Sequence, residues 1–243
     1  MKILFIRPII TQRENYLEED IVKEFASANT EVIARHLEYG PSSIENEYDL
    51  VYSSPFVLEE AIKGEKDGFD GIISYCFANP AVDACREAVS IPVLGSGEAS
   101  MAMALAVGRR ISIVTILPNI LPLIRKQWEP HIRNGKVVSV RSANVPVLSI
   151  GDGSDEIFEK LYQEAKMAIL EDGADAIVLG CTGFAGFAQK IQERLKEDGF
   201  IVPVLDPAAT SIKMMEALVT CNVRNSRVTY MEPIEKTIEL PQR

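Results

Sequence analysis

The sequence predicts an α/β fold with two pseudosymmetric lobes, each a small parallel sheet flanked by helices, and a site between them. The first observation behind this prediction is a ten-residue repeat. The stretches 67–76 (DGFDGIISYC) and 172–181 (DGADAIVLGC) share five of ten positions, and both end in cysteine. Each reads as a tight Asp-Gly turn and a short apolar run typical of a buried parallel strand. The second observation is that strand and helix patterns alternate in the same order in both halves.

In the first half, short apolar runs predict strands, and apolar residues at helical spacing predict the helices between them. The pattern at 46–63 indicates one or two helices interrupted near Pro55, because proline lacks the N–H that a helix interior needs. Asn79-Pro80 places a proline at a helix start. The predicted strands are 2–6, 31–37, a strand ending at Cys76, and 91–94; the predicted helices are 15–28, 46–63 and 81–89.

The second half repeats this order. The predicted strands are 110–115, 136–141, a strand ending at Cys181, and 202–205; the predicted helices are 98–107, 120–132, 155–171 and one from Thr210 onward. We expect this last helix to pack back on the first lobe. The predicted lobes are therefore 1–96 with 211–243, and 97–210. The tail at 222–243 has little periodicity, and we assign it no structure.

Composition limits the class of partner. The chain has 243 residues, of which 47% are hydrophobic and 25% charged, and its formal net charge is -10. An acidic field repels nucleic acid and anionic membranes, so neither is expected as a partner and a small molecule is favoured. No apolar run approaches the roughly 20 residues that span a bilayer, and the first seven residues are too short for a signal-peptide core. We expect a cytoplasmic protein.

Four cysteines in a chain of this length do not indicate a disulfide framework. There is no Cys-x-x-Cys pair and there are only two histidines, so no metal site is predicted. The segment Gly95-Ser96-Gly97 lacks the third glycine of a dinucleotide-binding loop. We therefore predict no cofactor. Cys85 and Cys221 lie inside helical patterns without counterparts in the repeat, and we interpret them as structural.

Cys76 and Cys181 end equivalent strands, and the carboxyl ends of parallel strands face the crevice where ligands bind in open α/β sheets. Each precedes a turn into a predicted helix, whose N-terminal N–H groups lower a thiol pKa and can hold an anionic oxygen. Two thiols on opposite sides of a ligand can remove a proton from carbon and return one to the other face. Such a substrate carries a carbonyl next to its stereocentre. The competing interpretation is that each cysteine is a small apolar filler.

Several segments carry a family resemblance. They are Gly40-Pro41-Ser42-Ser43-Ile44-Glu45 followed by Tyr48-Asp49, Cys76-Phe77-Ala78-Asn79-Pro80, Pro92-Val93-Leu94-Gly95 with Glu98-Ala99, and Val178-Leu179-Gly180-Cys181-Thr182-Gly183. Over nearly the whole chain, the sequence resembles the aspartate/glutamate/hydantoin racemase superfamily, in its hydantoin (allantoin) racemase branch. The resemblance implies a cofactor-independent homo-oligomeric enzyme with one catalytic cysteine from each lobe. It assigns those roles to Cys76 and Cys181, and oxygen-binding N–H groups to the turns at 77–79 and 182–183.

The chain departs from this branch at two places. Arg7-Pro8-Ile9-Ile10 stands where the branch usually has Asn-Pro-Asn, and Asn79 replaces an aspartate. Arg7 could bind a substrate carboxylate, or form a surface or interlobe ion pair. For Ser43, Asn79 and Thr182 the competing interpretation is that the side chain caps a helix. For Phe77 it is that the ring belongs to the core. The predicted substrate-binding residues are Arg7, Ser43, Phe77, Asn79, Thr115, Thr182 and Gly183.

The sequence thus predicts a racemase that acts on a 5-substituted hydantoin or related cyclic amide through two cysteines. A second hypothesis is a racemase or isomerase of an amino acid or dicarboxylate, of the aspartate/glutamate racemase or maleate isomerase type. Superfamily decarboxylases commonly keep one of the two cysteines, so the intact pair argues against that reaction. A third hypothesis is a two-lobed binding protein without catalytic activity, which would give no reason for thiols at both strand ends.

Overall fold

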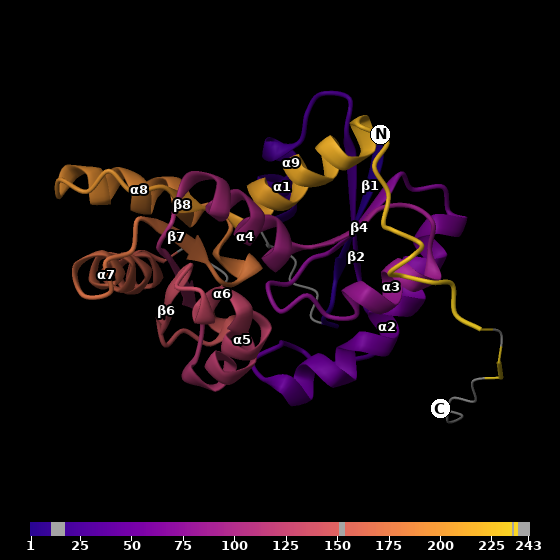
Figure 1. The fold of residues 1–243 in the computed structure, drawn as a ribbon, viewed down its shortest axis with the longest axis horizontal. Helices are drawn as coiled ribbons and strands as arrows, with labels where there is room; N and C mark the ends of the chain where they lie inside the picture. Colours follow the sequence, from indigo (N-terminus) through magenta and orange to yellow (C-terminus); the bar gives the residue numbers. More distant parts are fainter. Residues whose placement is uncertain (11–17, 151–153, 235, 238–243) are drawn as a thin grey trace.

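The protein, seen in a computed structural model that describes residues 1–10, 18–150, 154–234 and 236–237, contains two four-stranded parallel sheets side by side (Figure 1). Their strand orders are β2-β1-β3-β4 and β6-β5-β7-β8, the same order in both lobes. This duplication confirms the predicted fold class. The strands are β1 (Lys2–Arg7), β2 (Glu31–His36), β3 (Gly71–Ser74), β4 (Val93–Gly95), β5 (Ile111–Thr115), β6 (Val137–Ser142), β7 (Ala176–Leu179) and β8 (Val204–Leu205).

Helices cover both faces of each sheet, and α4 lies between the two lobes (Figure 1). The first-lobe helices are α1 (Glu18–Phe25), α2 (Glu47–Lys66) and α3 (Val82–Ala88), followed by α4 (Ser96–Val107). The others are α5 (Leu121–Gln127), α6 (Glu129–Arg133), α7 (Asp155–Leu170), α8 (Phe187–Glu197) and α9 (Pro207–Thr220), with short 3₁₀ turns η1 (Pro118–Ile120), η2 (Val147–Ser149) and η3 (Thr182–Phe184).

The first aspartate of the ten-residue repeat has the same role in both copies. Asp67 accepts from the Arg35 guanidinium at 2.5 Å, and Asp172 accepts from the Arg141 guanidinium at 2.6 Å. Each arginine comes from the outer strand of its sheet, β2 or β6. These hydrogen bonds lower the pKa of both carboxyls, and burial opposes the shift. An equivalent ion pair thus ties the turn to the outer strand of the sheet in each copy.

The second aspartate also has one role in both copies. Asp70 accepts from the Lys2 N–H at 2.7 Å, and Asp175 accepts from the Arg110 N–H at 2.8 Å, so each fixes the start of the neighbouring strand. The repeated glycine has φ of +79° at Gly68 and +66° at Gly173, a conformation that favours glycine. The repeated isoleucine is fully buried in both copies. Four of the five identical positions therefore have the same structural role in both copies, and the fifth is the cysteine.

Helix α2 passes through Pro55 without interruption, so the predicted break is wrong. Proline removes only the bond to the Val51 carbonyl, and Val51 is 59% exposed. Two fully buried residues beyond the proline, Val57 and Ala61, pack into the first-lobe core. Their burial holds the helix in one piece.

Other differences occur at prolines and caps. The predicted helix 120–132 is divided into α5 and α6, with Pro130 near the start of the second piece. Helix α9 begins at Pro207, earlier than predicted, because Asp206 caps it by accepting from the Ala208 N–H at 2.8 Å. The predicted helix over 15–28 is described from Glu18 onward, and its first three residues lie outside the described part.

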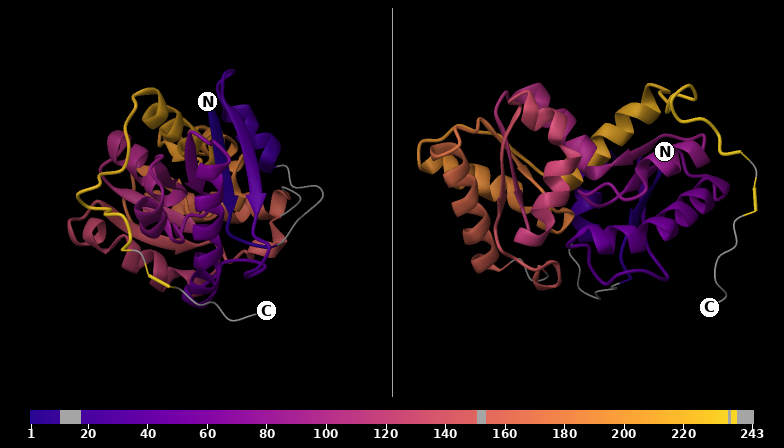
Figure 2. Two further views of the ribbon diagram at one scale, coloured as in Figure 1. Left: turned by 90° about the vertical axis from the view of Figure 1, so that its right-hand side faces the viewer. Right: turned by 60° about the horizontal axis from the view of Figure 1, so that its bottom comes forward.

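Helix α9 packs against α1 and α4 and contacts β3, whereas α4 also contacts β7 of the second sheet. Figure 2 shows α9, in yellow, lying over the first lobe. The lobe limits at 1–96 with 211–243 and at 97–210 stay a prediction. The following tail is placed: Asn225 accepts from the Val93 N–H on the edge strand β4, and Arg227 donates to the Val89 carbonyl. The tail therefore covers a sheet edge. In the described part of the chain, helices long and apolar enough to cross a membrane are absent.

One carboxylate ties α9 to the first lobe and predicts an acid-sensitive contact. Glu216 accepts from the Ser27 N–H at 2.7 Å and from the Lys213 ammonium at 2.9 Å. Burial raises the pKa of Glu216, but these hydrogen bonds outweigh it and lower the pKa to about 2. A carboxyl with a lowered folded pKa stabilises the fold above its unfolded pKa and loses that contribution as pH falls through the folded value.

We expect Glu216→Gln to lower the free energy of unfolding at pH 7 by roughly 2 kcal/mol, and to remove part of the stability loss that the parent shows between about pH 4.5 and pH 2. Urea unfolding at several pH values measures both effects. The control is Glu197→Gln on α8, where the side chain is exposed. Equal pH dependence in the parent and Glu216→Gln would contradict the assignment.

Candidate active site

One cavity between the lobes contains both repeated cysteines. Cys76 and Cys181 are each partly buried and line the same cavity. The first lobe supplies its wall from the end of β1, the loop before α2 and the end of β3, and the second lobe from η2 and the loop after β7. The described lining residues are Arg7, Pro8, Ile9, Ile44, Tyr75, Cys76, Val147, Cys181, Thr182 and Gly183.

The two cysteines reach the cavity because β3 and β7 extend to the same point. The Tyr75 N–H donates to the Ile6 carbonyl at 2.9 Å, and the equivalent Gly180 N–H donates to the Val114 carbonyl at 2.7 Å. The next residue in each copy is the cysteine. The Thr182 hydroxyl donates to the Tyr75 carbonyl at 3.5 Å, which connects the residue after one cysteine to the residue before the other. The predicted Thr182 and Gly183 are therefore in the cavity wall.

The turn after Cys76 packs tightly against the N-terminus of α4. Asn79 has φ of +52°, and its side-chain oxygen accepts from the Gly97 N–H at 2.9 Å. A Cβ at position 97 would lie 2.2 Å from the Phe77 carbonyl oxygen, so this position requires glycine. The Gly95-Ser96-Gly97 segment thus serves close packing of the turn. Asn79, predicted to bind substrate, uses its oxygen to hold this turn.

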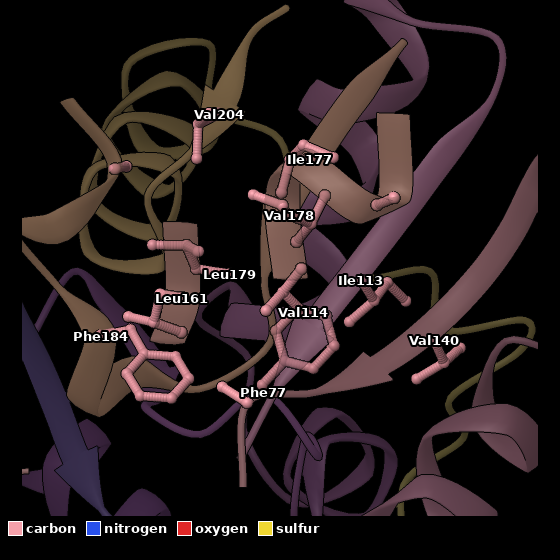
Figure 3. Packing of buried hydrophobic residues seen from close by; sticks show 14 of the residues in the cluster. Phe77, Ile113, Val114, Val140, Leu161, Ile177, Val178, Leu179, Phe184 and Val204 are labelled. Carbon is pink, nitrogen blue, oxygen red and sulfur yellow. The ribbon is translucent and has the colours of Figure 1, made fainter. Parts of the chain in front are cut away.

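Phe77 is 2% exposed and belongs to the core of the second lobe, where its ring lies 6.3 Å from that of Trp128. Figure 3 shows Phe77 and Phe184 among the aliphatic side chains of β5 and β7. The prediction that Phe77 binds substrate gives way to the competing core interpretation. Its role is to anchor the Cys76 turn in the other lobe.

Two further candidates lie beside the site. The buried Thr115 hydroxyl donates to the Gly180 carbonyl at 2.9 Å, so Thr115 supports the residue before Cys181. Ser43 is partly buried next to Ile44, which lines the cavity. The competing cap interpretation of Ser43 is wrong, since Asn46 caps α2 by accepting from the Asp49 N–H at 3.0 Å.

Arg7 lies in the cavity wall with both cysteines, and only 6% of its surface is exposed. Its Nη1 is 3.3 Å from Nε2 of His36, which pairs with it across β1 and β2. Since a guanidinium stays charged in proteins, it brings positive charge to the cavity wall. The structure thus places Arg7 in the wall of the cavity that both cysteines line.

The helix arrangement differs from expectation at one cysteine. Cys181 directly precedes the single turn η3, but α3 begins at Val82, after a turn from Cys76. A helical turn therefore starts directly after Cys181 but not after Cys76, contrary to the expectation for both.

The other two cysteines have different surroundings. Cys85 is fully buried, and burial raises the pKa of its thiol to about 12, whereas Cys221 is exposed. A thiol with this pKa stays protonated at neutral pH and is unreactive. Within the described ranges, no group of three His, Cys, Asp or Glu side chains is arranged to hold a metal ion.

The predicted site residues do not include Ile44 and Val147, which contribute an apolar wall to the cavity. The internal repeat could have indicated both residues, because they lie in the loops that follow the equivalent strands β2 and β6. These loops meet across the lobes, where the Val147 N–H donates to the Glu45 carboxylate at 2.7 Å.

Comparison with known proteins agrees with this arrangement. Residues 17–215 match the Asp/Glu/Hydantoin racemase family model. A hydantoin racemase of Pseudomonas sp. (strain NS671) is 34% identical over 97% of this chain and 93% of its own, and one of Rhizobium meliloti is 35% identical over 85% and 84%. The solved allantoin racemase from Klebsiella pneumoniae superposes with a TM-score of 0.90 at 32% identity, covering 98% of this chain and 96% of its own. The chain therefore belongs to the Asp/Glu/hydantoin racemase family, in the hydantoin racemase branch.

Proposed function

We propose that this racemase inverts the stereocentre of a 5-substituted hydantoin or related cyclic amide, with Cys76 and Cys181 as its two acid/base groups. One observation carries the proposal. Of the five positions identical in both copies of the repeat, folding accounts for the two aspartates, the glycine and the isoleucine. The fifth position is the cysteine, and both copies of it line one cavity.

The proposed reaction needs one thiolate and one thiol. The thiolate takes the proton from the ring carbon next to the carbonyl, and the electron pair of that C–H bond moves toward the carbonyl oxygen as an enolate. The opposite thiol then gives its proton to the other face of the same carbon. The product is the mirror image, and the two sulfurs have exchanged protonation states.

The enolate oxygen needs hydrogen-bond donors, and one of the two thiols must be ionised before the reaction starts. The N–H groups of Thr182 and Gly183, in the cavity wall, are the proposed donors on one side, and those of the turn after Cys76 on the other. Arg7 supports the ionised thiol, since an opposite charge nearby favours the charged form of an acid.

Arg7 also supports the second candidate function. A buried guanidinium in a cavity otherwise lined largely by apolar groups suits a carboxylate, so an amino acid or dicarboxylate substrate is the alternative. The same charge is compatible with a hydantoin whose side chain ends in a carboxylate.

The test is a panel of enantiopure 5-alkyl hydantoins, allantoin, free amino acids and dicarboxylates, followed by polarimetry for the chiral compounds and by proton NMR for the dicarboxylates. We expect decay of optical rotation to zero with a cyclic amide, without added cofactor. Conversion of only free amino acids or dicarboxylates would favour the alternative. Tight binding without change of rotation across the panel would favour a binding protein.

Assembly also belongs to this proposal. We propose a homo-oligomer on the basis of the family resemblance, and a cytoplasmic location stays a prediction from the sequence. Sedimentation equilibrium of the purified protein measures the mass of the assembly, and a monomer at working concentrations would contradict it.

A further inference from the structure

The loops that follow the two cysteines are anchored in complementary ways. In the first copy, the loop residue Asn79 supplies the acceptor, and the Gly97 N–H at the start of α4 donates. In the second copy the parts are exchanged: Asp206, the N-cap of α9, accepts from the Gly186 N–H of the loop at 2.7 Å. The other Asp206 oxygen accepts from the Ala208 N–H at 2.8 Å. One carboxylate therefore caps a helix and holds the Cys181 loop.

The two anchoring helices are joined to each other. Helices α4 and α9 pack together, and the hydroxyls of Ser100 and Thr210 lie 2.8 Å apart. The Thr210 hydroxyl is also 2.8 Å from the Asp206 carbonyl oxygen. The side chains of Ser100, Thr210 and Asp206 are all more than nine-tenths buried. Hydrogen bonds at such buried positions are stronger than in water. The helix pair thus links the Cys76 loop to the Cys181 loop through the interior.

We propose that this α4–α9 pair is a brace that fixes the two thiols on opposite sides of the substrate, with Asn79 and Asp206 as positioning residues. The inference rests on the proposed function for its catalytic meaning. Racemisation by two bases requires that both thiols address the same carbon, and a misplacement of about 1 Å can cost 10²-fold in rate. Each anchor acts on one thiol only, so each should affect one face of the reaction.

The variants are chosen to separate positioning from folding. Asp206→Ser keeps a side chain that can cap α9 but is too short to also hold Gly186. Asn79→Ala removes the acceptor for Gly97. The matched control is Asp175→Ser, which removes hydrogen bonds to the Arg109 and Arg110 N–H groups at the opposite end of β7 from Cys181. All are made in a Cys221→Ser background, because that exposed thiol would dominate chemical labelling.

The first measurement needs no substrate: iodoacetamide labelling rates at each cysteine, followed by mass spectrometry of peptides. We expect Asp206→Ser to raise the rate at Cys181 at least threefold and leave Cys76 unchanged, and Asn79→Ala to do the reverse. Equal changes at both cysteines, or the same pattern in Asp175→Ser, would overturn the brace.

The second measurement compares proton exchange with inversion in deuterated water. With one thiol displaced, the other still removes its proton, so exchange continues for one enantiomer while inversion falls at least tenfold. Asp206→Ser and Asn79→Ala should retain exchange of opposite enantiomers, whereas a general loss of folding lowers both alike and would count against the proposal. If the parent racemises nothing in the panel but the labelling pattern appears, the proposed function fails and the brace stands.

Discussion

Cys76→Ser and Cys181→Ser are each expected to lower kcat for racemisation by roughly 10²–10⁴-fold, the range typical for loss of a general acid or base. A serine hydroxyl ionises far less readily than a thiol, so it neither takes nor gives the proton at neutral pH. Because each thiol serves one face, a variant should still exchange the hydrogen of one enantiomer. Polarimetry measures inversion, and proton NMR in deuterated water measures exchange for each enantiomer.

The matched control is Cys221→Ser, which removes an exposed thiol outside the cavity and should keep full activity. Circular dichroism shows whether the cavity variants remain folded. Full racemase activity in either Cys76→Ser or Cys181→Ser would reject the two-thiol mechanism, whatever the substrate proves to be.

The repeat allowed the fold to be predicted because its identical residues have the same role in both copies. Asp67 and Asp172 hold a turn to the next strand edge, and the buried Ile72 and Ile177 fix which face of the strand is covered. These features recur at the same positions in both copies, so the spacing of the repeat is enough to indicate them. The repeat also marks where each strand ends, and therefore where each cysteine lies in the fold.

The substrate-binding residues were harder to predict, because tertiary packing decides whether a side chain faces the cavity. Phe77 follows a cysteine but is buried in the opposite lobe, and Thr115 ends a strand but bonds to a backbone carbonyl. Arg7 is the opposite case, since its place in the cavity depends on the meeting of the two lobes. Asp206 lies far from Cys181 in the chain and reaches its loop only through the fold.

Arg7→Met is expected to lower the ratio of kcat/KM for a carboxylate-bearing hydantoin to that for a neutral 5-alkyl hydantoin by roughly 10- to 10²-fold. A hydrogen bond to a charged partner contributes about 1.5–3 kcal/mol, and only the anionic substrate loses it. The variant should also shift the rising limb of the pH–rate profile to higher pH for every substrate, because a thiol that loses a nearby cation ionises at higher pH.

Two further variants separate charge from geometry. Arg7→Lys keeps the charge but not the planar fork, so it should preserve the pH profile while recovering only part of the substrate ratio. Lys23→Met applies the same loss of charge to an exposed cation in a neighbouring cavity that Arg7 also borders, and both quantities should stay unchanged. An unaltered substrate ratio in Arg7→Met would mean that Arg7 does not meet the substrate carboxylate. If the pH profile of Arg7→Met still shifts in that case, the role of Arg7 is to activate the thiols. The two results can differ because the substrate and the thiols are separate partners of one guanidinium.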